Sequence, residues 1–167
     1  INALPSQSAI TVELTWDTPN DPDQLDGNGT DLDLHFLHSS AQGWGDRVYD
    51  CYYANVFPDW GPRGREGNPS FDIDDVNGAG PERLSLNLPE NDVTYKIGVV
   101  YFNMGANDTD PVGFGSSDAT VRVYIFGQLE GEWATRLTMV GQFWEVASLT
   151  WGENERSIDE INRLYDE

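Results

Sequence analysis

The 167-residue sequence contains one lysine, one cysteine and two histidines, and it lacks a long hydrophobic run. Phosphate recognition depends on Lys and Arg, so nine basic residues against 29 acidic ones exclude nucleic acid as a partner. No segment approaches the length needed for membrane insertion. A lone Cys51 excludes an internal disulfide, and its strand-like surroundings predict a small core residue. One cysteine and two histidines are few ligands for a zinc site.

The chain is rich in acidic residues. Its formal net charge is −20, and aspartate outnumbers glutamate, which favours loops and metal ligation over helix surfaces. A hydrophobic content of 38% and an aromatic content of 12% argue against a disordered acidic tail. Strong acidity with almost no lysine suits a saline or extracellular setting, where ions screen the self-repulsion.

The length predicts a single domain over residues 1–167, with its core at about 9–151. The sequence opens at Ile1 without a visible signal peptide, which indicates a mature form or an excised domain. Its oligomeric state is open.

Most of the sequence alternates apolar and polar residues with a period of two. The clearest runs are 10–16, 32–36, 84–88, 95–102 and 119–125. The segments 136–140 and 143–151 are expected to form a final pair joined near Gly141. Turn signals separate these runs, so we expect an all-β fold, namely a two-sheet antiparallel β-sandwich of jelly-roll or immunoglobulin-like type.

Only the tail has a helical pattern. Ser157 and Glu160 have the spacing of a capping box, and Ile158, Ile161 and Leu164 share one helical face. The sequence predicts a short C-terminal helix at about 157–165.

Two acidic stretches lie beside predicted strands. In the first, Asp31-Leu32-Asp33-Leu34-His35, alternation places both aspartates and the histidine on one face. In the second, 71–82, Phe71 and Ile73 are expected to face the core, while Asp72 and Asp74 face outward before a glycine-rich turn. If the two strands are neighbours, their carboxylates converge.

Converging carboxylates repel one another unless a cation lies among them, and oxygen ligands select a hard ion such as Ca²⁺. The alternative is a solvated turn in which aspartates cap backbone amides. The predicted calcium site consists of Asp31, Asp33, Asp72, Asp74, Asp75, Asn77 and Glu82.

A second, looser metal site is a further hypothesis. Asp21, Asp23, Asp26 and Asn28 recur at spacings of two or three residues. Leu25 occupies a position where an EF-hand loop needs a ligand, so the segment is not an EF-hand. Solvated acidic turns are the alternative.

Aromatic residues crowd the segment 44–60. Flat rings beside polar groups suit a sugar- or peptide-binding surface, and Trp44, Tyr52 and Trp60 are the candidate ligand-binding aromatics. The alternative is that these rings fill or cover the core.

The motif D-x-D-L-H at Asp31–His35, followed by D-x-D-D-x-x-G-x-G-P-E at Asp72–Glu82, resembles the YfaP / DUF2135 family of bacterial secreted and surface proteins. The resemblance covers roughly residues 10–126. It implies an extracytoplasmic β-sandwich, secreted, periplasmic or at the cell surface, with no catalytic role to carry over.

We therefore expect a non-enzymatic calcium-binding module for surface adhesion, with a glycan or a surface protein as partner. The first alternative is a purely structural acidic module of a larger surface protein or fibre. The second is a carboxylate-based glycoside hydrolase, which is disfavoured because no hydrolase motif and no convincing triad are present.

Overall fold

The computed structural model describes residues 8–76, 78–105 and 113–166. The described part is all-β, as predicted, with one short 3-10 turn. Its elements are β1 (Ile10–Asp17), β2 (Asp31–His38), β3 (Asp50–Cys51), η1 (Arg65–Gly67), β4 (Ser70–Ile73), β5 (Glu82–Leu86), β6 (Val93–Asn103), β7 (Ser117–Ile125), β8 (Gln128–Leu137), β9 (Gln142–Trp151) and β10 (Arg156–Asp166).

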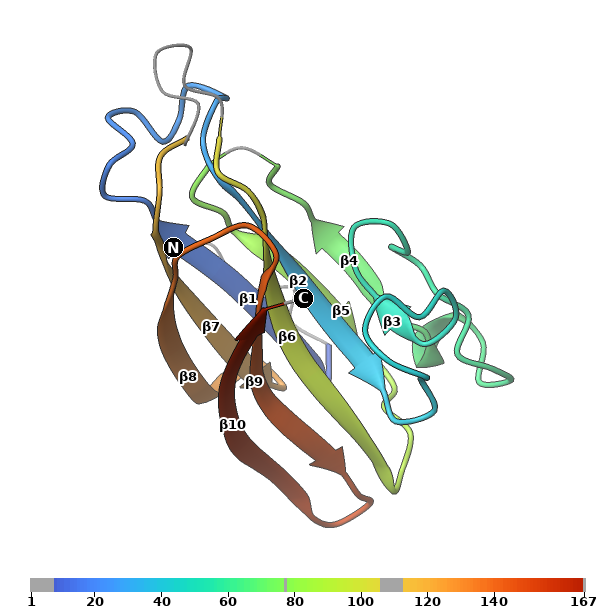
Figure 1. Ribbon diagram of the computed structural model, residues 1–167. Helices are drawn as coiled ribbons and strands as arrows, with labels where there is room; N and C mark the ends of the chain where they lie inside the picture. Colours follow the sequence, from blue (N-terminus) through green and yellow to red (C-terminus); the bar gives the residue numbers. More distant parts are fainter. Residues whose placement is uncertain (1–7, 77, 106–112, 167) are drawn as a thin grey trace.

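The strands form two antiparallel sheets of five strands each. One sheet has the order β4-β5-β1-β7-β8 and the other has the order β10-β9-β6-β2-β3. The two sheets lie face to face as two layers (Figure 1). The predicted antiparallel β-sandwich is therefore confirmed.

The core lies between the two layers. Alternation in β1 and β7 places Val12, Leu14, Val121 and Val123 inside with no exposed surface, which explains the period of two in those segments. Cys51 is also fully buried, as expected of a small core residue.

Strand β2 differs from its neighbours because it is buried on both faces. Leu32, Leu34 and Phe36 belong to the core cluster, and the alternate positions belong to Asp31, Asp33 and His35. Strand β3 pairs only with Phe36 and Leu37. The first half of β2 therefore has no β3 partner on that edge, and this edge positions the site described below.

The expected C-terminal helix is wrong, because residues 156–166 form strand β10, which pairs with β9. A β-bulge lies between Glu160 and Arg163, with Asn162 at φ 48°. The bulge places an extra residue in the strand, so half-buried Ile158 and Ile161 recur three residues apart and imitate a helical face.

The expected pairing of 136–140 with 143–151 is also wrong. Strand β8 ends at Leu137 and pairs with β7, whereas β9 belongs to the other sheet. The turn near Gly141 therefore carries the chain from one sheet to the other. Within the described residues, no helix has the length and apolar character needed to cross a membrane.

Candidate functional site

Three carboxylates from two different sheets meet at the free edge of β2. Asp31 and Asp33 come from β2, and Glu82 begins β5 in the opposite sheet. One ligand oxygen from each lies within 4.8 Å of the others. Glu82 Oε2 also accepts a hydrogen bond from the backbone N–H of Leu34 at 2.6 Å. The edge N–H that β3 does not reach is thus satisfied by a side chain of the other sheet.

These carboxylates are almost wholly removed from solvent. The exposed fraction is 6% for Asp31, 2% for Asp33 and 0% for Glu82. One oxygen of each, namely Asp31 Oδ1, Asp33 Oδ2 and Glu82 Oε1, is buried without a hydrogen-bond partner. Among the described residues, none of the three forms an ion pair with a basic side chain. Buried charge without a counter-charge is costly.

This cost raises the pKa values of all three carboxyl groups. Burial, followed by the charges of Asp74 and Asp75, raises the pKa of Asp31 to about 6. Burial, followed by Asp31 and Asp74, raises the pKa of Asp33 to about 8. Burial also raises the pKa of Glu82 well above its ordinary value, against the opposing effect of the Leu34 N–H. Without a cation, the cluster therefore holds protons near neutral pH.

Asp74 and Asp75 approach the cluster from the turn after β4. Asp75 Oδ2 accepts a hydrogen bond from the Gly80 N–H at 2.9 Å, which fixes the carboxylate inside the turn. A Cβ added at Gly78 would come 2.7 Å from the same oxygen, so any larger residue there would displace the Asp75 carboxylate. The turn thus adds two carboxylates to the acidic surroundings of Asp31, Asp33 and Glu82.

The other two residues of the predicted site are not placed in this cluster. Asp72 is exposed, and its Oδ1 accepts a hydrogen bond from Ser70 Oγ at 2.6 Å. Asn77 lies outside the described residues. The pairing of β4 with β5 shifts between Phe71 and Ile73, which leaves Ile73 38% exposed. The expectation that Ile73 faces the core is therefore wrong, because a bulge breaks the alternation.

The residues of the predicted second metal site do not form a cluster like that of Asp31, Asp33 and Glu82 among the described residues. Asp21, Asp23 and Asp26 each accept a hydrogen bond from the backbone N–H two residues further on, so these aspartates shape turns. Asp21 Oδ2 is buried without a partner, whereas Asp23, Asp26 and Asn28 are exposed. Among the residues described, the acidic groups close enough to hold one ion are Asp31, Asp33 and Glu82.

Of the three candidate aromatics, Trp60 is buried, whereas Trp44 and Tyr52 are half-buried. Trp60 is 5% exposed and stacks on Phe36 and Tyr95 in the core, so its face is not free for a ligand. Tyr52 stacks on His35 with 4.8 Å between ring centroids, and the Trp44 ring meets the same imidazole edge-on at 6.0 Å.

A buried contact between His35 and Asp50, which the sequence does not predict, lies beside those rings. His35 Nδ1 lies 2.7 Å from Asp50 Oδ2, and Asp50 is fully buried. The same oxygen of Asp50 accepts the Gly45 N–H at 2.7 Å, which ties the 41–50 segment to β2. No spacing signal marks Asp50, because its partner comes from a different strand. His35 thus faces a carboxylate of its own, separate from the cluster.

The ligand set has the character of a hard-cation site. Its donors are carboxylate oxygens that lie within 4.8 Å of one another, and each of the three residues has one buried oxygen without a hydrogen-bond partner. Calcium takes about six to eight oxygens at roughly 2.3–2.6 Å, so oxygens on opposite sides of one ion lie about 5 Å apart. The separations observed here fit that geometry, with Asp74 and Asp75 adjacent.

No family model matches the sequence. No curated protein matches it either. A solved structure with a similar fold is the crystal structure of a protein of unknown function, SAV2460. The match has a TM-score of 0.52 at 15% identity and covers 96% of this chain and 91% of that chain. At this identity the likeness concerns the fold alone.

Proposed function

We propose that this chain is a non-enzymatic, calcium-binding β-sandwich module that acts in adhesion outside the cytoplasm, as a secreted, periplasmic or surface protein of a bacterium. The observation that carries the proposal is a buried set of three acidic residues, Asp31, Asp33 and Glu82. One ligand oxygen of each lies within 4.8 Å of the others, and each residue has one buried oxygen without a hydrogen-bond partner. A divalent cation supplies the missing partner for all three at once.

Calcium fits better than the other common ions. The set contains no thiolate or imidazole, which argues against zinc and copper. Magnesium demands near-ideal octahedral geometry and keeps several waters, whereas calcium accepts irregular oxygen sets with high coordination numbers. Carboxylates from β2, from β5 and from the turn that carries Asp74 make such an irregular set.

The cation links the two sheets. Asp31 and Asp33 belong to one sheet and Glu82 to the other, so an ion bound to all three joins the two layers. A ligand that binds only the folded chain stabilises it by mass action. Outside the cytoplasm, weak sites with dissociation constants of about 0.1–1 mM suffice for extracellular modules. The resemblance to the YfaP / DUF2135 family stays a prediction that agrees with this setting.

A binding role is favoured over hydrolysis. A glycoside hydrolase needs two carboxylates on either side of a sugar, with room for that sugar between them. Asp33 and Glu82 are 2% and 0% exposed, so a sugar ring has no access to them. A purely structural module remains the alternative if the surface takes no ligand.

Thermal unfolding tests the proposal. Melting temperatures are measured in EDTA and in millimolar Ca²⁺ or Mg²⁺ for the natural chain, for Asp33→Asn and for Asp72→Asn. Asp72 is the matched control because it is an exposed aspartate outside the cluster. At about a hundred times the dissociation constant, Ca²⁺ is expected to raise the melting temperature by about 5 to 10 °C.

The shift is expected to persist in Asp72→Asn and to vanish in Asp33→Asn. A melting temperature that ignores Ca²⁺ in the natural chain contradicts the proposal. So does an equal shift in both variants, because the ion would then bind elsewhere.

A further inference from the structure

A groove of about 1100 Å³ lies on the outer face of β4 and β5. Its floor consists of polar side chains that point away from the core, including Ser70 and Asp72 of β4, Arg83 and Ser85 of β5, and Asn87 just after β5. Its wall is the segment 57–69. Because alternate residues of β5 face opposite ways, Glu82 belongs to the cation cluster while Arg83 belongs to the groove.

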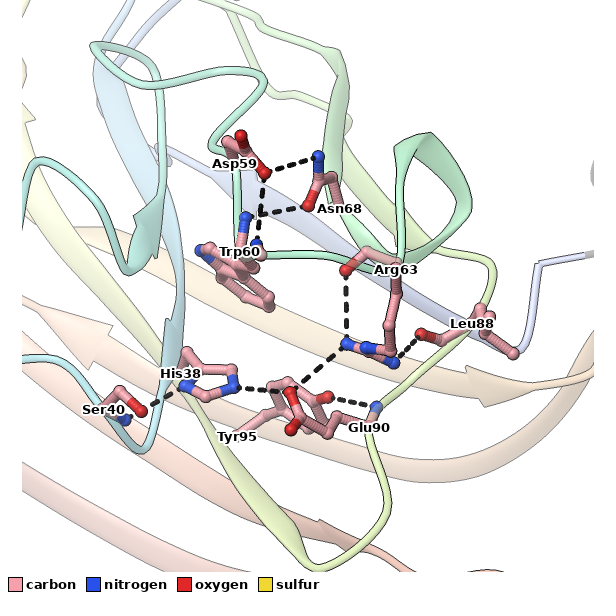
Figure 2. Close-up of polar contacts among 11 residues, drawn as sticks. His38, Ser40, Asp59, Trp60, Arg63, Asn68, Leu88, Glu90 and Tyr95 are labelled. Atoms are coloured by element: carbon pink, nitrogen blue, oxygen red, sulfur yellow. Dashed lines mark hydrogen bonds and ion pairs between the residues drawn. The ribbon is translucent and has the colours of Figure 1, made fainter.

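The wall is fixed to the floor before any ligand arrives. The Leu88 N–H donates to the Glu66 carbonyl at 2.7 Å, and Asn87 Nδ2 donates to Glu66 Oε2 at 3.0 Å. Arg63 Nη1 donates to the Leu88 carbonyl at 2.5 Å (Figure 2). A preformed site loses less conformational entropy when it binds.

The upper part of the wall has its own hydrogen bonds. Asn68 Oδ1 accepts the Trp60 N–H at 2.8 Å, and Asn68 Nδ2 donates to Asp59 Oδ1 at 3.3 Å, as Figure 2 shows. Trp60 itself is buried in the core, so it anchors this part of the wall to the sandwich. Asn68 and Asp59 also line the groove.

One apolar ring stands among these polar groups. Phe57 lines the groove and is 69% exposed. Arg65 also lines it, is exposed, and forms no ion pair within the described parts of the chain. An exposed ring and an unpaired guanidinium in one polar groove suit a ligand that has a C–H face and hydroxyl groups, which is the chemistry of a sugar ring.

Charge excludes a polyanionic ligand. Asp59, Glu66 and Asp72 line the groove, against Arg65 and Arg83, and Arg83 already pairs with Glu13. The whole chain carries −20, so a sulfated or uronic polymer is repelled.

An extended peptide is disfavoured on other grounds. Such a peptide adds to a free strand edge, yet on the outer edge of β4 the Phe71 N–H already donates to the Val56 carbonyl at 2.9 Å. That edge is therefore occupied at its middle, and the side-chain floor is what remains for a ligand.

We infer that this groove binds a neutral oligosaccharide, with the Phe57 ring stacked on a sugar face and Arg65 donating to its hydroxyl groups. The inference names the ligand class of the adhesion role proposed above and rests on that role. It uses none of Asp31, Asp33 and Glu82, so the calcium measurement can fail while this one succeeds, and the reverse.

The test is a glycan array probed with the labelled natural chain, followed by calorimetric titration of any retained neutral oligosaccharide. The variants are Phe57→Ala, Arg65→Ala and, as a control, Phe126→Ala, which removes a phenylalanine of similar exposure that is absent from the groove lining. Thermal unfolding verifies that each variant is folded.

We expect retention of a neutral glycan, affinity about tenfold weaker in Phe57→Ala and Arg65→Ala, and unchanged affinity in Phe126→Ala. Failure to retain any neutral glycan overturns the inference. Equal affinity in all variants also overturns it. Capture of an extended peptide from a peptide array, lost in Phe57→Ala, shows that the groove takes protein and overturns it as well.

Discussion

Glu82 of one sheet accepts a hydrogen bond from the backbone N–H of Leu34 of the other at 2.6 Å, and its second oxygen, Oε1, is buried without a partner. One carboxylate therefore has two functions. It satisfies an edge amide that β3 does not reach, and it contributes a carboxyl group to the cluster with Asp31 and Asp33.

The two functions of Glu82 separate by mutation. Glu82→Gln retains an oxygen for the Leu34 N–H and removes the charge, whereas Glu82→Ala leaves the N–H unsatisfied and creates a cavity. In EDTA we expect Glu82→Ala to lose about 2–4 kcal/mol of unfolding free energy relative to Glu82→Gln. Urea unfolding measures the difference. Equal stability of the two variants would show that the hydrogen bond contributes nothing.

Without a cation, the stability of the fold is expected to fall as pH rises. The pKa of Asp33 is about 8 in the folded chain and returns to an ordinary value near 3.8 on unfolding. Between these values the folded chain holds a proton that the unfolded chain has released, so raising the pH favours unfolding. The melting temperature in EDTA should decline from about pH 4 to about pH 8, and Asp33→Asn should flatten this decline. A profile that is flat in the natural chain contradicts the buried cluster.

Calcium affinity is expected to change with pH in the opposite direction. The raised pKa values of Asp31, Asp33 and Glu82 mean that calcium must displace protons near neutral pH. Titration calorimetry at about pH 6 and about pH 8.5 should show tighter binding at the higher pH. Affinity independent of pH would place the ion among ordinary, exposed carboxylates instead.

Gly78 is expected to control the position of Asp75. In Gly78→Ala the new Cβ would come 2.7 Å from Asp75 Oδ2, so the carboxylate must move. We expect calcium affinity to fall about tenfold, or about 1.4 kcal/mol. Gly43→Ala is the control, because its Cβ would meet nothing within 4 Å. A similar calcium affinity in both variants would show that the 74–80 turn does not contribute to calcium binding.

The Trp60→Ala variant is expected to be less stable than the natural chain, and the effect does not involve a ligand. The ring lies in the core against Phe36 and Tyr95, and loss of a buried tryptophan costs about 3–5 kcal/mol. Tyr53→Ala is the comparison, since Tyr53 is 42% exposed and should cost far less. Denaturant midpoints measure both. Unchanged stability in Trp60→Ala would return this ring to the list of ligand candidates.

Alternation predicted the strands that have one buried face. Strands β1 and β7 alternate in sequence because their inward residues fill the core. Strand β8 was missed over most of its length because it is an edge strand whose side chains are exposed or half-buried on both faces. The sequence of strand β10 predicts a helix because the bulge spaces its half-buried residues by three.

The acidic cluster was foreseeable only in part. Alternation in Asp31–His35 placed both aspartates on one face, and the structure brings Glu82 to them from the other sheet. The bulge in β4 was not foreseeable, because Phe71 and Ile73 keep the alternation of a regular strand in the sequence. The burial of Trp60 was equally hidden, because composition cannot distinguish a core ring from an exposed one.

The most direct test of the account is calorimetric titration of Ca²⁺ into the EDTA-treated natural chain, Asp33→Asn and Asp72→Asn. We predict saturable binding of one Ca²⁺ ion per chain in the natural protein and in Asp72→Asn, and no binding at this site in Asp33→Asn. An absence of binding heat in the natural chain, or the same isotherm in Asp33→Asn, would contradict it.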